Sequence, residues 1–284
     1  MSVSEKRKFF GKRGNKKDPN AEMTFVDHIE DLRWHIVRAL IAILVGGVVM
    51  FIYSGEVFDN IIVAPAKKDF LSYRIMCKLG ELTHISALCL DEINLEFQNT
   101  ELSGQFMMSF SVSFMLGFII AFPYVFWEFW RFIKPALSQK ELSHARGIVF
   151  WTSLLFFTGV LFAYYVIAPF TINFFANYTL SPTFKNIITI TNYYNTLFDL
   201  VLGIGLVFEL PVVVYFLSRI GLLTPMLMRS KRSYAILIIF VLAAIITPPD
   251  MFSLWLVCIP LLILYQVSIT ISERAYKERM KNRD

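Results

Sequence analysis

The 284-residue sequence is poor in the residues from which catalytic and metal sites are usually built. Its four histidines are scattered without the spacing of metal ligands, and its three cysteines form no Cys-x-x-Cys pair. The sequence contains no phosphate-binding loop, no Gly-x-Ser-x-Gly and no His-Glu-x-x-His. We therefore expect no catalytic residues, no cofactor and no metal site.

Charge is also scarce. Only 17% of the residues are charged, against about 25% in soluble domains, while 56% are hydrophobic and the mean hydropathy is +0.57. A helix needs about 20 apolar residues to cross the bilayer core. The apolar runs predict an all-α, polytopic membrane protein with six transmembrane helices, at residues 36–53, 106–127, 147–170, 197–217, 233–247 and 252–271.

The remaining segments are expected to be tails and loops around one membrane domain. Residues 1–22 are polar and Lys-rich, which is typical of a disordered basic tail. The six spans belong to a single domain, 23–275, whose longest loop, 54–105, is expected to form an outer cap containing short helices. Residues 276–284 form a second tail. No cleavable signal peptide precedes the first span, because no small-residue cleavage site follows it.

The distribution of Lys and Arg predicts the orientation. Of the 27 basic residues, 22 fall in the tails and loops on the side of the termini and five on the opposite side. Because cytoplasmic loops carry the excess of Lys and Arg, both termini are predicted to be cytoplasmic. The net charge of +5 then reflects topology and does not indicate a nucleic-acid surface.

The last two spans have unusual lengths and breaks. Only 15 residues separate Arg232 from Pro248, which is about 22 Å of helix and short of the hydrocarbon thickness. Pro260 is expected to interrupt the sixth span. Between these spans, two prolines force a tight turn, in which Asp250 can accept hydrogen bonds from nearby backbone N–H groups.

One carboxylate lies within an apolar run, LVFELPVVV, at Glu209. A charged acid at such a depth costs about 2.5–3.5 kcal/mol on insertion scales. Pro211 loosens the helix just after it, and Gly203 and Gly205 permit close approach of another helix. Three interpretations are open. The acid bonds a carbonyl freed by the proline, it docks a polar group of a partner's transmembrane helix, or it relays protons in a proton-coupled secondary transporter.

The cysteines suggest one cross-link. Cys77 and Cys89 are the two cysteines on the predicted outer face, where oxidising conditions favour a disulfide. Cys258 lies in the sixth span and is expected to be a small core residue.

Four motifs in order resemble the TatC family, the core of the twin-arginine protein translocase. HIEDLR at 28–33 is similar to the family signature before the first span, and KPALSQKE at 134–141 to its first cytoplasmic loop. FELP at 208–211 resembles the fourth span, and TPPDMFS at 247–253 the last outer turn. The resemblance covers about residues 23–275.

This resemblance implies a fold and a function. The fold is a concave cup of six tilted helices in the bacterial cytoplasmic (inner) membrane. The protein binds signal peptides with two consecutive arginines at the cytoplasmic face. It assembles with TatB-like and TatA-like single-span proteins, in contact with membrane lipid and as a homo-oligomer within a larger complex. Folded proteins then cross the membrane, driven by the proton-motive force without nucleotide hydrolysis.

The family's functional positions carry over by motif. The acids that bind the signal peptide fall on Asp31 and Glu141, with Arg33 in the same signature and Phe132 as the loop aromatic. The positions of the outer loops and of the fourth span fall on Pro65, Pro248, Asp250 and Glu209. The chemistry agrees, because guanidinium groups pair with carboxylates in a bidentate fork. Without the family, Asp31 would be read as a partner of a nearby arginine, and Glu141 as a solvated loop charge.

The sequence departs from the family at several positions. Asp31 stands where the family usually has Glu, and Glu30 sits beside it, so either acid could make the contact. His35 replaces a usual arginine, and Leu254 a common glutamine. The outer loop, 66–100, is longer than in familiar members, and its role is open.

Overall fold

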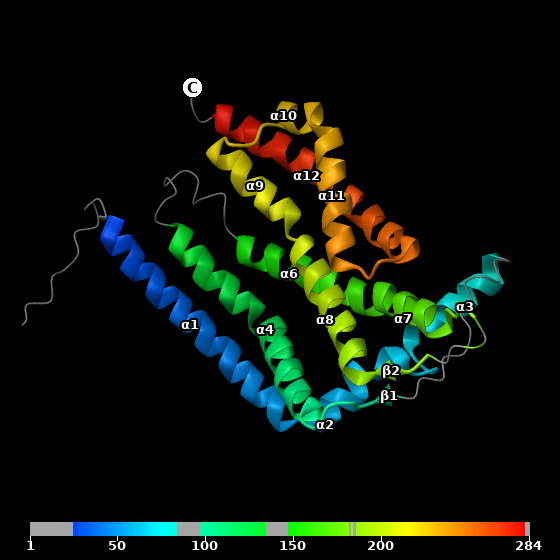
Figure 1. The fold of residues 1–284 in the computed structure, drawn as a ribbon. Coiled ribbons are helices and arrows are strands. Elements are labelled where there is room, and N and C mark those ends of the chain that lie inside the picture. The colour runs from blue at the N-terminus through cyan, green and yellow to red at the C-terminus, as the bar shows by residue number, and fades with distance from the viewer. Residues whose placement is uncertain (1–24, 84–96, 135–146, 182, 184–185, 282–284) are drawn as a thin grey trace, which may run out of the picture.

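A computed structural model describes residues 25–83, 97–134, 147–181, 183 and 186–281 of the chain. The predicted basic tail at 1–22 therefore lies outside the described residues. The described part is almost entirely helical (Figure 1). Its elements are α1 Phe25–Ile52, α2 Ser54–Val57, the π-helix η1 Phe58–Ile62, the 3-10 helix η2 Ala64–Ala66, α3 Leu71–Thr83, β1 Phe97–Gln98, α4 Gly104–Ile133, α6 Ile148–Phe162, the π-helix η5 Ala163–Ile167, α7 Ala168–Asn177, β2 Ile188–Thr189, α8 Ile190–Val207, α9 Leu210–Ile220, α10 Pro225–Ser230, α11 Arg232–Ile246 and α12 Met251–Lys281.

The six predicted spans are confirmed as helices. Five helical segments are long and apolar enough to cross a membrane, and the fifth span, α11, is a shorter apolar helix of 15 residues. Figure 1 shows α1 and α4 side by side as one wall, with α9, α11 and α12 forming the other. The walls are joined through α8 and diverge toward the side on which α1 begins and α12 ends. That this side is cytoplasmic stays a prediction.

Several helices extend beyond the predicted spans. The third span continues through η5 and α7 to Asn177, and the fourth begins at Ile190 rather than at residue 197. The polar start of α8 is helical because the Thr189 side chain accepts a hydrogen bond from the Asn192 N–H, and because Tyr193, one turn into the helix, is buried in the core. Helices therefore extend beyond the apolar runs that revealed them.

The sequence predicted that Pro260 interrupts the sixth span, and this prediction is wrong. The helix α12 runs without a break from Met251 to Lys281, with the proline inside it. Transmembrane helices tolerate an internal proline when neighbouring helices and local adjustments compensate the lost bond. The adjacent residues Val257, Cys258 and Leu261 are fully buried in the main hydrophobic core, which holds this part of the helix in place.

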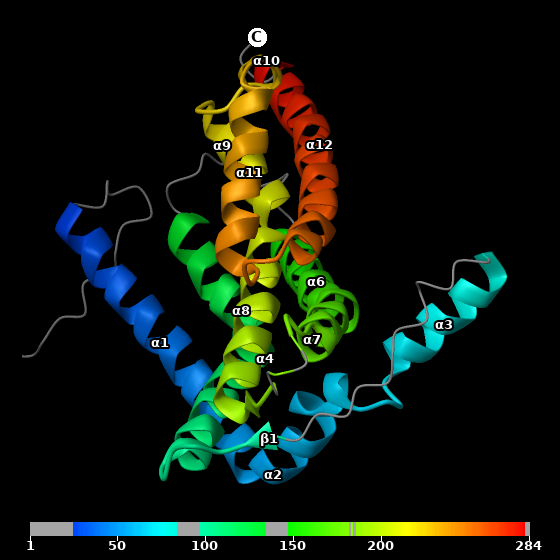
Figure 2. The ribbon, with the colours of Figure 1, turned by 45° about the vertical axis from the view of Figure 1, so that its right-hand side comes forward.

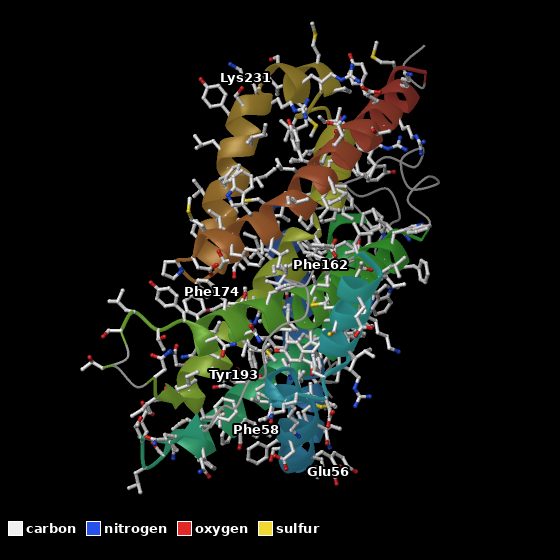
Figure 3. The ribbon with its side chains drawn as sticks, turned by 90° about the vertical axis from the view of Figure 1, so that its right-hand side faces the viewer. Glu56, Phe58, Phe162, Phe174, Tyr193 and Lys231 are labelled. Atoms are coloured by element: carbon white, nitrogen blue, oxygen red, sulfur yellow. The ribbon has the colours of Figure 1, made fainter. Side chains whose placement is uncertain are left out.

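Tyrosine hydroxyls fix the segment between α2 and α3. Tyr164 donates to the carbonyl of Ile61 at 2.6 Å, and Tyr193 donates to the carbonyl of Ile62 at 2.8 Å. Figure 3 shows Tyr193, Phe58 and Glu56 toward the same end of the molecule. The short strands β1 and β2 pair in parallel beside them. The predicted outer loop is thus held to the third and fourth spans.

Candidate functional site

The first two spans form a closely packed pair that positions the candidate site. A Cβ atom on Gly117 of α4 would lie 2.5 Å from the backbone nitrogen of Gly47 on α1, so only glycine permits this crossing. A Cβ on Gly46 would likewise meet the backbone of Gly117. The contact sets the relative position of the two helices. It therefore also positions the side chains at the end of the pair where α1 begins and α4 finishes.

At that end, a buried carboxylate joins the two helices. Glu128 is 1% exposed, and its Oε2 accepts a hydrogen bond from His35 Nδ1 at 2.5 Å. The Tyr124 hydroxyl donates to Oε1 at 3.1 Å. Two guanidinium groups lie slightly farther away, Arg131 at 3.5 Å and Arg38 at 3.8 Å. The carboxylate is therefore surrounded by donors from both helices, and its charge is compensated within the chain.

Sequence reasoning did not identify Glu128. The second span was predicted to end at Trp127, which placed the acid in a loop, whereas α4 continues to Ile133 and buries it. The available signal was an acid inside the aromatic stretch FWEFWRF, three residues before Arg131. Its partner His35 is 93 residues away in the sequence, so the pairing itself depends on the tertiary structure.

The residues predicted to bind the signal peptide fall at the same end. Asp31 lies one helical turn before His35 on α1 and is half-buried, while Glu30 and Arg33 are exposed. The ring of Phe132 meets the ring of His35 edge-on, with centroids 6.3 Å apart. The structure thus brings Phe132 of α4 beside the face of α1 that carries Asp31. Glu141 lies outside the described residues.

Glu209 occupies a break within the fourth span. It lies between α8 and α9, and Pro211 stands in the first turn of α9. Both carboxylate oxygens are buried, and neither has a hydrogen-bond partner of regular geometry among the described residues, although the backbone of Phe156 on α6 lies near enough to interact with the carboxylate. The two nearby glycines make the close contacts expected of them: a Cβ on Gly205 would meet Phe156 of α6, and one on Gly203 would meet Ile246 of α11.

The other predicted positions are structural in their surroundings. Asp250 Oδ1 accepts a hydrogen bond from the Ser253 N–H at 2.6 Å and so caps α12, as the sequence suggested, after the turn at Pro248. Pro65 is buried, and its carbonyl accepts a hydrogen bond from the Tyr73 hydroxyl at 2.8 Å. Burial raises the pKa of the Tyr73 phenol, so this group remains a donor at neutral pH.

The remaining positions considered in the sequence are the cysteines and Leu254, which stands where the family commonly has glutamine. Cys258 is free and buried, as predicted. Cys77 lies on α3 and is engaged in a disulfide, whereas Cys89 lies outside the described residues, so the predicted pair stays a prediction. Leu254 packs against the hydrophobic core. Within the described ranges, no group of three His, Cys, Asp or Glu side chains could hold a metal ion.

Comparisons with known proteins agree with one another. Residues 27–260 match the family model described as Sec-independent protein translocase protein (TatC). A TatC from Blattabacterium sp. subsp. Periplaneta americana is 40% identical over 93% of this chain and 100% of its own. TatCy from Bacillus subtilis is 32% identical over 92% and 93%. The crystal structure of the twin-arginine translocase receptor TatC has a TM-score of 0.68 and 30% identity, covering 87% of this chain and 99% of its own.

Proposed function

Because the chain belongs to the TatC family, and is thus a multi-pass bacterial membrane protein and a component of a Sec-independent protein translocase, we propose that it binds Arg-Arg signal peptides where α1 begins and α4 ends. The family is a protein translocase component and not a catalytic family. This membership favours a translocase over the proton-coupled carrier that the sequence also allowed.

The observation that carries the proposal is the arrangement of Asp31, His35 and Phe132 at one end of the α1–α4 pair. A half-buried carboxylate one helical turn from the residue that contacts an aromatic ring suits a guanidinium group, which can pair with the acid and stack on a ring. Glu128 is already compensated by His35 and resident arginines. The signal-peptide arginines pair with Asp31 and with Glu141, the two acids that the family motifs indicate.

Binding of a twin-arginine signal peptide to variants tests this assignment. Asp31→Ala and Glu141→Ala each weaken binding, and Glu141→Lys abolishes it through like-charge repulsion. Glu30→Ala is the matched control, because this acid is exposed while Asp31 is half-buried, and it leaves binding nearly unchanged. Wild-type affinity in both alanine variants would remove these two residues from the site. Sensitivity confined to Glu30 would shift the assignment by one residue.

We also propose that Glu209 docks a polar group on the transmembrane helix of a TatA-like or TatB-like partner. The support is a carboxylate whose two oxygens have no hydrogen-bond partner of regular geometry in the described part of the chain. The neighbouring span α11 has only 15 residues, and a short span thins the bilayer around it. In this account the partners assemble there as a larger complex, and the proton-motive force drives folded proteins across.

A further inference from the structure

The helix α3 begins against a membrane-spanning segment. The Ser72 hydroxyl donates to the carbonyl of Tyr165 at 2.5 Å. The ring of Phe70 stacks on the ring of Tyr165, with centroids 5.5 Å apart and planes inclined by 8°. Tyr165 lies in η5, inside the helical span Ile148–Asn177. These two contacts therefore fix the first turn of α3 against an apolar, membrane-spanning helix.

From this point α3 runs outward from the membrane domain. Figure 2 shows α3 projecting from the body, clear of the other helices, whereas in the view of Figure 1 it overlaps the end of α7. In both views its far end lies at the level of α6 rather than at the level of α2 and β1. An element at that depth on the perimeter of a membrane protein adjoins lipid.

The two faces of α3 differ in the way that an interfacial helix requires. Leu71, Ile75 and Leu82 lie along one side at helical spacing and are 54%, 48% and 78% exposed. Ser72, the next residue round the helix from Leu71, is 5% exposed, and Gly80, on the side opposite the stripe, is buried.

Lys78 shares the face of the apolar residues, since it follows Ile75 by three positions and precedes Leu82 by four, and Arg74 lies beside that face. An amphipathic helix with apolar and basic residues arranged in this way lies in the membrane interface, where a long Lys side chain extends to the headgroups while the apolar residues enter about 5–10 Å into the boundary with the acyl chains.

The charges beside this stripe identify the lipid. Four of the five basic residues predicted on the outer side occur between residues 67 and 78, and Lys67, Lys68, Arg74 and Lys78 are all exposed. Arg74 lies 3.2 Å from Asp69, but this pair is exposed and a phosphate can compete for it. Lys and Arg side chains near an anionic lipid surface are attracted to its headgroups.

We propose that α3 is an interfacial anchor that seats its Leu71–Ile75–Leu82 stripe in the adjoining leaflet and binds anionic phospholipid headgroups through Arg74 and Lys78. The proposal rests on the membrane location of the chain and not on signal-peptide binding. The proposal gives a role to the outer loop, 66–100, whose unusual length was noted in the sequence. By binding lipid, α3 would hold the outer cap in place from outside the helix bundle.

The test uses the full chain reconstituted in phosphatidylcholine vesicles, with or without phosphatidylglycerol. A fluorescent amino acid is placed at position 75 or 82, on the stripe, or at position 81 as the matched control on another side of the same helix. Phospholipids with a quencher at defined acyl depths report immersion. We expect quenching at 75 and 82 to be severalfold stronger than at 81, and strongest for quenchers just below the headgroups.

Phosphatidylglycerol is expected to increase quenching at position 75. The double variant Arg74→Glu, Lys78→Glu reduces it toward the level of position 81, whereas Arg274→Glu with Lys277→Glu, an equal charge change on α12, leaves it unchanged. An unaltered unfolding temperature shows that each variant is folded. Equally weak quenching at all three positions would overturn the proposal, and so would cross-linking of position 75 to a second copy, which would make the stripe a protein interface.

Discussion

Removing the buried carboxylate of Glu128 is predicted to destabilise the α1–α4 pair strongly. Breaking a buried ion pair by deleting one partner costs about 3–5 kcal/mol. Arg38 and Arg131 are 46% and 45% exposed, so both can turn to water, whereas His35 is only 16% exposed. We therefore expect Glu128→Ala to lower the free energy of unfolding by about 3 kcal/mol, at the lower end of that range.

The contribution of the His35–Glu128 contact can be isolated with a double-mutant cycle. A hydrogen bond to a charged group contributes about 1.5–3 kcal/mol, so His35→Ala and Glu128→Ala should be non-additive by a similar amount when unfolding is followed with denaturant in detergent. Glu128→Gln is milder, because its amide oxygen still accepts from His35. Glu273→Ala, which removes the exposed pair with Arg229, serves as control and costs about 0.2–1 kcal/mol. Additive effects of the first two substitutions would refute the reasoning.

Three further predictions concern the membrane domain. Glu209→Ala leaves folding and signal-peptide binding intact but lowers transport and cross-linking to the partner helix, with Glu209→Gln milder; unchanged transport and cross-linking would make this acid structural. Cysteines introduced within 1–20 stay protected from an impermeant thiol reagent in intact cells, while those within 90–100 react, and the reverse pattern would invert the topology. Mapping of protein from oxidising conditions finds Cys77 linked to Cys89, which stabilises the cap by up to about 3 kcal/mol; free thiols at both positions would contradict the pairing.

The spans were predictable because the length of an apolar helix is set by the thickness of the bilayer. Their ends were not, since local capping and packing decide them. The fourth span begins at Ile190 because Thr189 caps it and Tyr193 is buried, and neither effect is visible in hydropathy. Pro260 was misjudged because a break was inferred from the residue alone, while the surrounding core keeps the helix continuous.

The candidate site was predictable only in part. Asp31 and Phe132, which the family motifs indicated, lie at the same end of the α1–α4 pair, because α1 and α4 are adjacent spans of a hairpin; their role in binding stays a prediction. The buried Glu128 was missed, since its burial depends on α4 extending past the interface and on His35 arriving from the other helix. Motifs thus indicate residues that are expected to bind a ligand, while the residues that hold the helices together require the structure.

The central claim, recognition of consecutive arginines by the acids at the end of the α1–α4 pair, is tested most directly by comparing two peptides. The affinity of an Arg-Arg signal peptide for the protein in lipid nanodiscs is measured beside that of the same peptide with Lys-Lys. Lysine cannot form the bidentate pair, so we predict binding at least about tenfold weaker, equivalent to 1.4 kcal/mol, and a smaller difference in Asp31→Ala. Equal affinities for the two peptides in the wild-type protein would contradict the account.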